Sequence, residues 1–156
     1  STGLRIEILR AREAFGELGD ALEAFAEFGD DASSVRADLL VEASQAAARV
    51  GNMYLALKRA RRGADLCPEA PGPQLYARGL EYRLRGIGTP DEARDTAIRL
   101  RGIRGIEDAN DEALRAFLLA ESLDGIEGGN AGLRAPADTK QRIGLPPPAA
   151  GSGYHS

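Results

Sequence analysis

The segment from Leu40 to Pro68, LVEASQAAARVGNMYLALKRARRGADLCP, constrains the fold of this chain more than any other. Its apolar residues recur at helical spacing on both sides of Gly51-Asn52, a pair typical of tight turns. Pro68 closes the segment, because proline cannot continue a helix. Two helices folded back on each other are therefore predicted. Small residues stand where the helices must touch: Ala43, Ser44 and Ala47 on the first helix, and Ala56 and Ala60 on the second.

The composition favours packed helices along the whole chain. Its 156 residues are rich in alanine, leucine, arginine and glutamate, and aromatic residues make up only 5%, as is typical of helical proteins. One domain is the default at this length. The single cysteine, Cys67, excludes a disulfide within the chain, and no long apolar run predicts a membrane span. We therefore expect an all-α protein of a reducing compartment, the cytoplasm.

The net charge of −4 conceals three regions of different sign. Residues 1–48 hold 4 basic and 10 acidic groups, residues 49–104 hold 12 and 6, and residues 105–156 hold 4 and 8. A basic middle between two acidic ends predicts local rather than global electrostatic surfaces.

Helical spacing also predicts a pair of helices before the central segment. We expect a first helix over residues 4–18, a break at Gly19-Asp20, and a second helix over residues 21–28 that packs antiparallel to the first. The apolar face of the first helix carries Leu4, Ile8, Ala11, Phe15 and Leu18.

Capping signals place the starts of later helices. The helix that ends before Gly51 should begin at Ser33 or Ser34, either of which can supply a capping oxygen. A third pair of helices should begin near Gln74. Its second helix has a clear start in TPDE, where Thr89 can cap and Glu92 completes a capping box.

The C-terminal part predicts one more helix and then a tail. A helix over residues 110–123 has no returning partner, and the sequence after it is rich in glycine, proline and alanine. We therefore divide the chain into a helical domain, residues 1–127, and an extended tail, residues 128–156. The proline-rich residues 145–154 can form a polyproline II segment that docks into the groove of this chain or onto a neighbouring chain; the alternative is a linker.

The predicted turns at Gly19, Gly51 and Gly86 are separated by 32 and 35 residues, and a helix-turn-helix unit repeated at such a period indicates a solenoid. The pattern is carried by Ile8, Ala11, Phe15, Gly19, Ala24 and Phe28 in the first unit; Leu40, Ala43, Ser44, Ala47, Ala56, Ala60 and Pro68 in the second; and Leu75, Gly79, Tyr82, Gly86, Ala93 and Ala97 in the third. These intervals resemble the tetratricopeptide repeat (TPR) family. The resemblance implies a right-handed α-solenoid of about three TPR-like repeats with a C-terminal capping helix.

The resemblance also implies a concave groove, lined by the first helix of each repeat, that holds a protein partner or peptide. Val41 and Gln45 occupy the best-aligned places, so we do not expect the clamp by which some members hold a C-terminal carboxylate. For each groove residue, packing inside the superhelix is an equal alternative. The implied groove residues are Leu9, Glu13, Asp38, Val41, Gln45, Arg49, Tyr76, Leu80 and Arg83.

A basic run offers a second interpretation. Clustered guanidinium groups contact phosphates well, so this run could bind nucleic acid or another anion. The alternative is that these cations offset the negative end of a helix dipole. The run consists of Lys58, Arg59, Arg61 and Arg62, and Arg99, Arg101 and Arg104 extend its basic character, as a solvated face on the simpler interpretation.

Catalytic patterns are weak. The only histidine is His155, in the tail, so we expect no catalytic triad and no histidine-metal site. Cys67 is expected to be a small buried hydrophobe rather than a nucleophile. We therefore predict a non-enzymatic protein without cofactor or metal. Its expected role is that of an interaction scaffold or assembly subunit, with self-association through the tail as one option and a nucleic-acid or anion-binding module as the alternative function.

Overall fold

The computed structural model describes residues 2–131, and the regular secondary structure of this part is all α-helical, as predicted. No strand is present between residues 2 and 131. The helices are α1 (Thr2–Ala11), α2 (Phe15–Phe28), α3 (Ser33–Arg49), α4 (Met53–Leu66), α5 (Pro71–Arg85), α6 (Pro90–Gly102) and α7 (Ala109–Ala131). No helix of the described part has the length and apolar character needed to cross a membrane.

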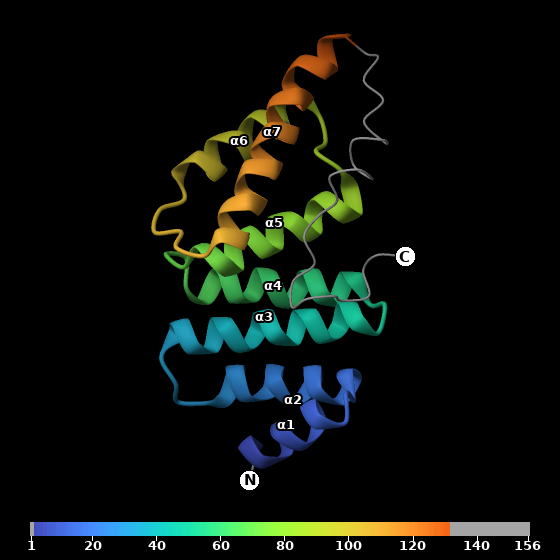
Figure 1. The fold of residues 1–156 in the computed structure, drawn as a ribbon, viewed down its shortest axis with the longest axis vertical. Helices are drawn as coiled ribbons and strands as arrows, with labels where there is room; N and C mark the ends of the chain where they lie inside the picture. The colour runs from blue at the N-terminus through green and yellow to red at the C-terminus, as the bar shows by residue number, and fades with distance from the viewer. Residues whose placement is uncertain (1, 132–156) are drawn as a thin grey trace.

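The helices form a stack with a splayed end (Figure 1). α2, α3 and α4 lie side by side, with α1 against α2 and α5 against α4. α7 packs against both α5 and α6, whereas α5 and α6 make at most a marginal contact with each other. The third pair of helices predicted from the sequence is therefore not a close hairpin like α3 and α4.

The predicted hairpin at Gly51-Asn52 is confirmed. Gly51 adopts a φ of 85°, and the Asn52 side chain accepts a hydrogen bond from the backbone N–H of Leu55 at 3.1 Å, which caps α4. Ser44 Oγ donates to the carbonyl oxygen of Ala56 at 2.5 Å across the helix crossing. The small residues named above are buried, so the two helices can approach closely.

The N-terminal prediction was wrong about the turn. α1 ends at Ala11 and α2 begins at Phe15, so the break lies around Glu13, which has a positive φ of 54°. Gly19 lies inside α2 instead. A Cβ atom at Gly19 would overlap Nη1 of Arg59, so this glycine allows a close approach rather than a turn. The predicted apolar face is also shifted, since Leu4 is 60% exposed.

α3 begins at Ser33, as predicted, but its capping residue differs. Its capping position is Ala32, which makes no side-chain hydrogen bond, and Ser33 and Ser34 lie in the first turn. α5 begins at Pro71 rather than near Gln74, because proline is well tolerated in the first turn of a helix.

The capping box at the start of α6 is confirmed. The backbone N–H of Glu92 donates to Thr89 Oγ1 at 3.2 Å, and the N–H of Thr89 donates to Glu92 Oε1 at 2.9 Å. Two of the otherwise unpaired N–H groups at this helix end are thereby satisfied.

α7 is longer than predicted. It continues from Leu123 to Ala131, so residues 128–131, predicted as the start of the extended tail, are helical. Gly125 suits this helix because α7 packs tightly there: a Cβ atom would lie 2.6 Å from Ile87 Cγ2. The predicted proline-rich docking segment and His155 lie outside the described residues.

Three groups of buried apolar side chains hold the stack together. One joins α1, α2 and α3, a second joins α3, α4 and α5, and a third joins α5, α6 and α7. The third group lies beneath the splayed end, so α7 supplies the apolar floor between α5 and α6. Its buried members are Leu75, Tyr82, Leu100, Leu114, Phe117 and Leu118.

Candidate interaction site

The predicted groove residues divide into buried and accessible ones. Leu9, Tyr76 and Leu80 are only 6%, 7% and 1% exposed and pack in the core. For these three, the alternative of packing inside the fold applies, because a buried side chain presents no surface to a ligand. Val41 is half-buried against the same core as Tyr76 and Leu80.

The accessible groove residues do not converge on one cavity. Glu13, Asp38 and Arg49 are exposed, and the Arg49 guanidinium lies 4.4 Å from the centre of the Phe15 ring. Although Asp38 is exposed, neighbouring protein atoms partly desolvate its carboxyl group, and this desolvation raises the pKa of Asp38. None of the nine predicted groove residues, including the half-buried Gln45 and Arg83, lines the cavities described below.

The predicted basic run is largely neutralised by acidic partners. Arg59 is 2% exposed; its Nε donates to Glu23 Oε1 at 2.8 Å and its Nη2 donates to Asp20 Oδ1 at 2.8 Å. Its remaining Nη1 donates to the carbonyl oxygen of Ala43 at 3.1 Å. Arg59 therefore joins α4 to both α2 and α3. This role could not be inferred from the basic run in the sequence.

The two following arginines are also paired. Arg61 Nη2 lies 2.6 Å from Glu81 Oε2, and Arg62 Nε lies 2.8 Å from Glu27 Oε1. The hydrogen bond from Arg62 lowers the pKa of Glu27. Lys58 is exposed and makes no ion pair with the described residues. The run therefore presents much less positive charge than its sequence suggests.

A shallow hollow of about 460 Å³ lies between α2 and α4. Its walls include Tyr54, which is 76% exposed, and Leu57, together with both acidic and basic side chains. The acidic side chains are Glu23, Glu27 and Asp65. Because the charges on its walls nearly cancel, the hollow shows no preference for a charged ligand.

A pair of cavities lies between α5 and α6. The two cavities, of about 280 Å³ and about 450 Å³, are both lined by Arg78 from α5 and Arg99 from α6. We call the two together the α5–α6 cleft. The cleft exists because α7 separates α5 from α6. Its further lining residues are Glu81, Tyr82, Arg85, Gly86, Ile87, Glu92, Asp95, Thr96 and Leu118 at one end, and Pro68, Glu69, Gln74, Leu100, Gly102, Ile103 and Arg104 at the other.

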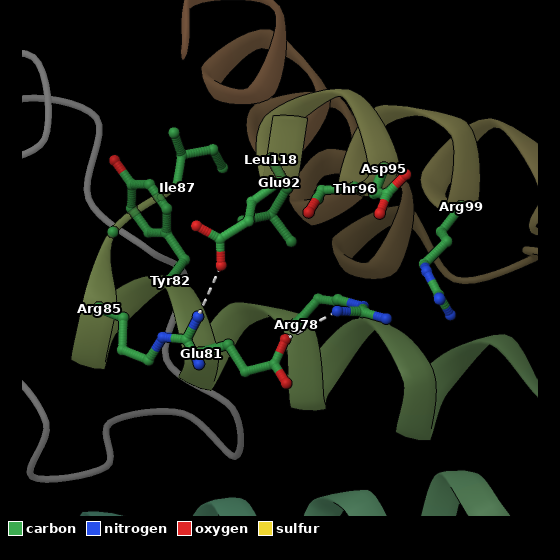
Figure 2. A pocket seen from close by; sticks show the side chains of 11 residues that line it. Arg78, Glu81, Tyr82, Arg85, Ile87, Glu92, Asp95, Thr96, Arg99 and Leu118 are labelled. Atoms are coloured by element: carbon green, nitrogen blue, oxygen red, sulfur yellow. Dashed lines mark hydrogen bonds and ion pairs between the residues drawn. The ribbon is translucent and has the colours of Figure 1, made fainter. Parts of the chain in front are cut away.

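At the first end of the cleft, side chains of α5, α6 and α7 interact with one another. Figure 2 shows the residues that line this end. Tyr82 Oη donates to Glu121 Oε1 at 2.6 Å, and the Tyr82 ring meets Phe117 edge-on with centroids 5.4 Å apart. Burial, and then the bond to Glu121, raises the pKa of Tyr82. Arg85 reaches across from α5 to Glu92 of α6 at 3.2 Å. Side chains of three helices thus fix the shape of this end.

The other end is basic. Arg78, Arg99 and Arg104 line it, and Glu69 is the one carboxylate among its lining residues. That carboxylate accepts a hydrogen bond from the thiol of Cys67 at 3.2 Å, which raises the pKa of the thiol and lowers the pKa of Glu69. Cys67 is therefore a buried, protonated side chain beside the cleft, as expected for a structural cysteine.

The chemistry of the cleft suits binding. Guanidinium groups, carboxylates and the Thr96 hydroxyl lie over an apolar floor formed by side chains such as Leu100 and Leu118. Within the described residues, no three histidine, cysteine, aspartate or glutamate side chains are grouped so as to hold a metal ion. Such a mixture of apolar floor and polar walls is typical of sites that hold a ligand by several weak contacts.

Sequence reasoning noticed Arg99 and Arg104 as basic residues but missed the cleft. Its walls come from two helices that were expected to pack together, and only the position of α7 holds them apart. Comparison with known protein families, curated proteins and solved structures found no match. The resemblance to the TPR family therefore stays a prediction.

Proposed function

We propose that this protein is a non-enzymatic scaffold that binds an extended segment of a protein partner in the α5–α6 cleft. The single observation that carries the proposal is that Arg78 and Arg99 line both cavities, so the two cavities adjoin at these residues. Adjoining cavities with an apolar floor can hold successive side chains of a peptide.

The rest of the fold supports a scaffold role. The stacked helices α2, α3 and α4 are joined by buried small residues and by the Arg59 bridge. They therefore form a well-packed stack that supports α5, α6 and α7. In our proposal this stack is a short solenoid of the TPR type, and α7 caps it. The buried thiol of Cys67 is in keeping with a reducing compartment such as the cytoplasm.

A peptide selection tests the proposal even though the partner is unidentified. A random peptide library displayed on phage would be selected against the wild-type protein, and the enriched peptides would be measured against two variants. Thr96→Trp fills the cleft, because Thr96 lines it. Ile98→Trp is the matched control, since Ile98 lies on the same helix and is 62% exposed. Thermal melting would establish that both variants fold.

The expected result is loss of peptide binding in Thr96→Trp and retention in Ile98→Trp. Equal binding to both variants would overturn the proposal. A third variant, Gln45→Lys, tests the groove implied by the TPR resemblance. Selective loss of binding in that variant would place the binding face on α3 instead of the cleft.

A further inference from the structure

At the basic end of the cleft, several guanidinium N–H groups have no hydrogen-bond partner among the described residues. Arg78 Nη1 donates to Glu81 Oε1 at 2.9 Å, which occupies one of its five N–H donors. Arg99 and Arg104 are exposed and make no hydrogen bond or ion pair with the described residues. Three separate segments bring these groups together: α5, α6 and the turn that follows α6.

The charges at this end do not cancel. Of its three arginines, Arg78 is paired with Glu81. Arg99 and Arg104 remain unpaired among the described residues and face the one carboxylate of Glu69, so the formal excess is about one positive charge. At the other end, by contrast, Arg78 and Arg85 are paired with Glu81 and Glu92, and Asp95 adds a further carboxylate. The unpaired guanidinium groups of the cleft are therefore available at the end that Arg99 and Arg104 line together.

We propose that the basic end of the α5–α6 cleft holds a phosphorylated side chain of the bound segment. This inference rests on the proposed function, because the segment itself lies along the cleft. A phosphate monoester carries about −1.5 to −2 charge and has three strong acceptor oxygens. Its oxygens can accept from the unpaired guanidinium groups of both Arg99 and Arg104, whereas a carboxylate brings only one charge and two oxygens.

Arginine suits this task. Its planar guanidinium group donates two parallel hydrogen bonds to phosphate oxygens, and such charge-assisted bonds are stronger than neutral ones. The space of about 450 Å³ at this end exceeds what a phosphate group alone would fill. A phosphate that enters as part of a side chain leaves room for the peptide to continue towards Thr96 and the apolar floor.

Fluorescence anisotropy with defined peptides tests the inference. The probe is a fluorescein-labelled pentapeptide with a central phosphoserine between alanine and glycine residues, and the matched peptides carry serine or glutamate at the centre. We expect the phosphoserine peptide to bind at least about tenfold more tightly than the serine peptide. Equal affinities for these two peptides would overturn the inference.

Charge variants locate the site. Arg99→Gln and Arg104→Gln should each weaken binding of the phosphoserine peptide by about fivefold to tenfold. Arg101→Gln is the matched control: Arg101 is exposed between the other two, and it lines neither end of the cleft. An equal loss in Arg101→Gln would show attraction to general positive charge and would overturn the assignment.

Competitors identify the source of the phosphate. Inorganic phosphate should displace the labelled peptide only at concentrations well above those of unlabelled phosphopeptide. If inorganic phosphate and the unlabelled phosphopeptide displace the probe at similar concentrations, the ligand of this end is free phosphate and not a phosphorylated segment. A twelve-nucleotide oligothymidylate is the second competitor. If it binds more tightly than the phosphoserine peptide and loses its binding in Arg99→Gln, that result would assign the site to nucleic acid and overturn the inference.

The two proposals can fail separately. If phosphorylation has no effect but Thr96→Trp still abolishes binding of the selected peptides, the phosphate inference falls and the scaffold function stands. If the selected peptides bind Thr96→Trp normally, the cleft is not the binding site, and both proposals fall.

Discussion

Tyr82 Oη donates a hydrogen bond to Glu121 Oε1 at 2.6 Å and so ties α5 to α7 beneath the α5–α6 cleft. Glu121 is only 7% exposed, so its carboxyl group depends on buried donors. Tyr82→Phe should lower the free energy of unfolding by about 1–3 kcal/mol, the cost of leaving a buried polar group with one partner fewer. Urea denaturation measures this change. Tyr54→Phe is the control, because Tyr54 is 76% exposed, and equal stability of the two variants would contradict the account.

Gly19 and Gly16 lie in the same helix but should respond oppositely to alanine. At Gly16 a Cβ atom would have no neighbour within 4 Å, so Gly16→Ala should stabilise the protein by about 0.5 kcal/mol through helix propensity. At Gly19 the new methyl group would displace the buried Arg59 and approach Ala46 Cβ to 3.3 Å. Gly19→Ala should therefore cost about 1–3 kcal/mol. Thermal denaturation of both variants measures the two changes. A gain of stability in Gly19→Ala would show that Gly19 of α2 is not in close contact with Arg59 of α4.

Arg59 should matter for stability far more than its exposed neighbour. Arg59→Met keeps most of the aliphatic stem but removes the hydrogen bonds to Glu23 and Asp20, for an expected loss of about 1–3 kcal/mol. Lys58→Met should change stability by less than about 0.5 kcal/mol, because Lys58 is exposed. Chemical denaturation compares them. If Lys58→Met is the more damaging variant, Arg59 does not act as a bridge.

Asp38 should make the stability depend on pH. Partial desolvation of its carboxyl group by neighbouring atoms raises its pKa in the folded state, so folding disfavours the carboxylate. The resulting cost is present at neutral pH and disappears as the pH falls below the ordinary aspartate pKa of about 3.9. Asp38→Asn should therefore raise Tm slightly at pH 7 and have no effect near pH 3.

The control for this pH dependence is Glu107→Gln, at an exposed position between α6 and α7. It should leave Tm unchanged at both pH values. A gain from Asp38→Asn that persists undiminished at low pH would show that the carboxylate charge is not its cause.

Local signals in the sequence predicted local structure well. The turn at Gly51-Asn52 and the capping box of Thr89 and Glu92 depend on residues that are close together in the sequence, so they can be recognised from the sequence alone. Gly19 misled the prediction, because a glycine can serve a turn or a close contact. Only the position of Arg59, on another helix, distinguishes these two uses.

The candidate site could not be predicted in the same way. The partners of Arg59 are 36 and 39 residues away in the chain, so the basic run did not reveal that its charge is neutralised. The cleft depends on α7, whose glycine-rich end has the composition of a tail, and Gly125 of that end packs against Ile87. The regional excess of positive charge in residues 49–104 was visible, but its gathering between α5 and α6 was not.

The most direct test of the central claim is an NMR titration of the ¹⁵N-labelled protein with the tightest peptide from the phage selection. We predict that the backbone amide shifts that change will cluster along α5 and α6, around Arg78, Thr96 and Arg99. Changes that cluster instead on α3, around Asp38 and Gln45, would contradict the claim that the α5–α6 cleft is the binding site.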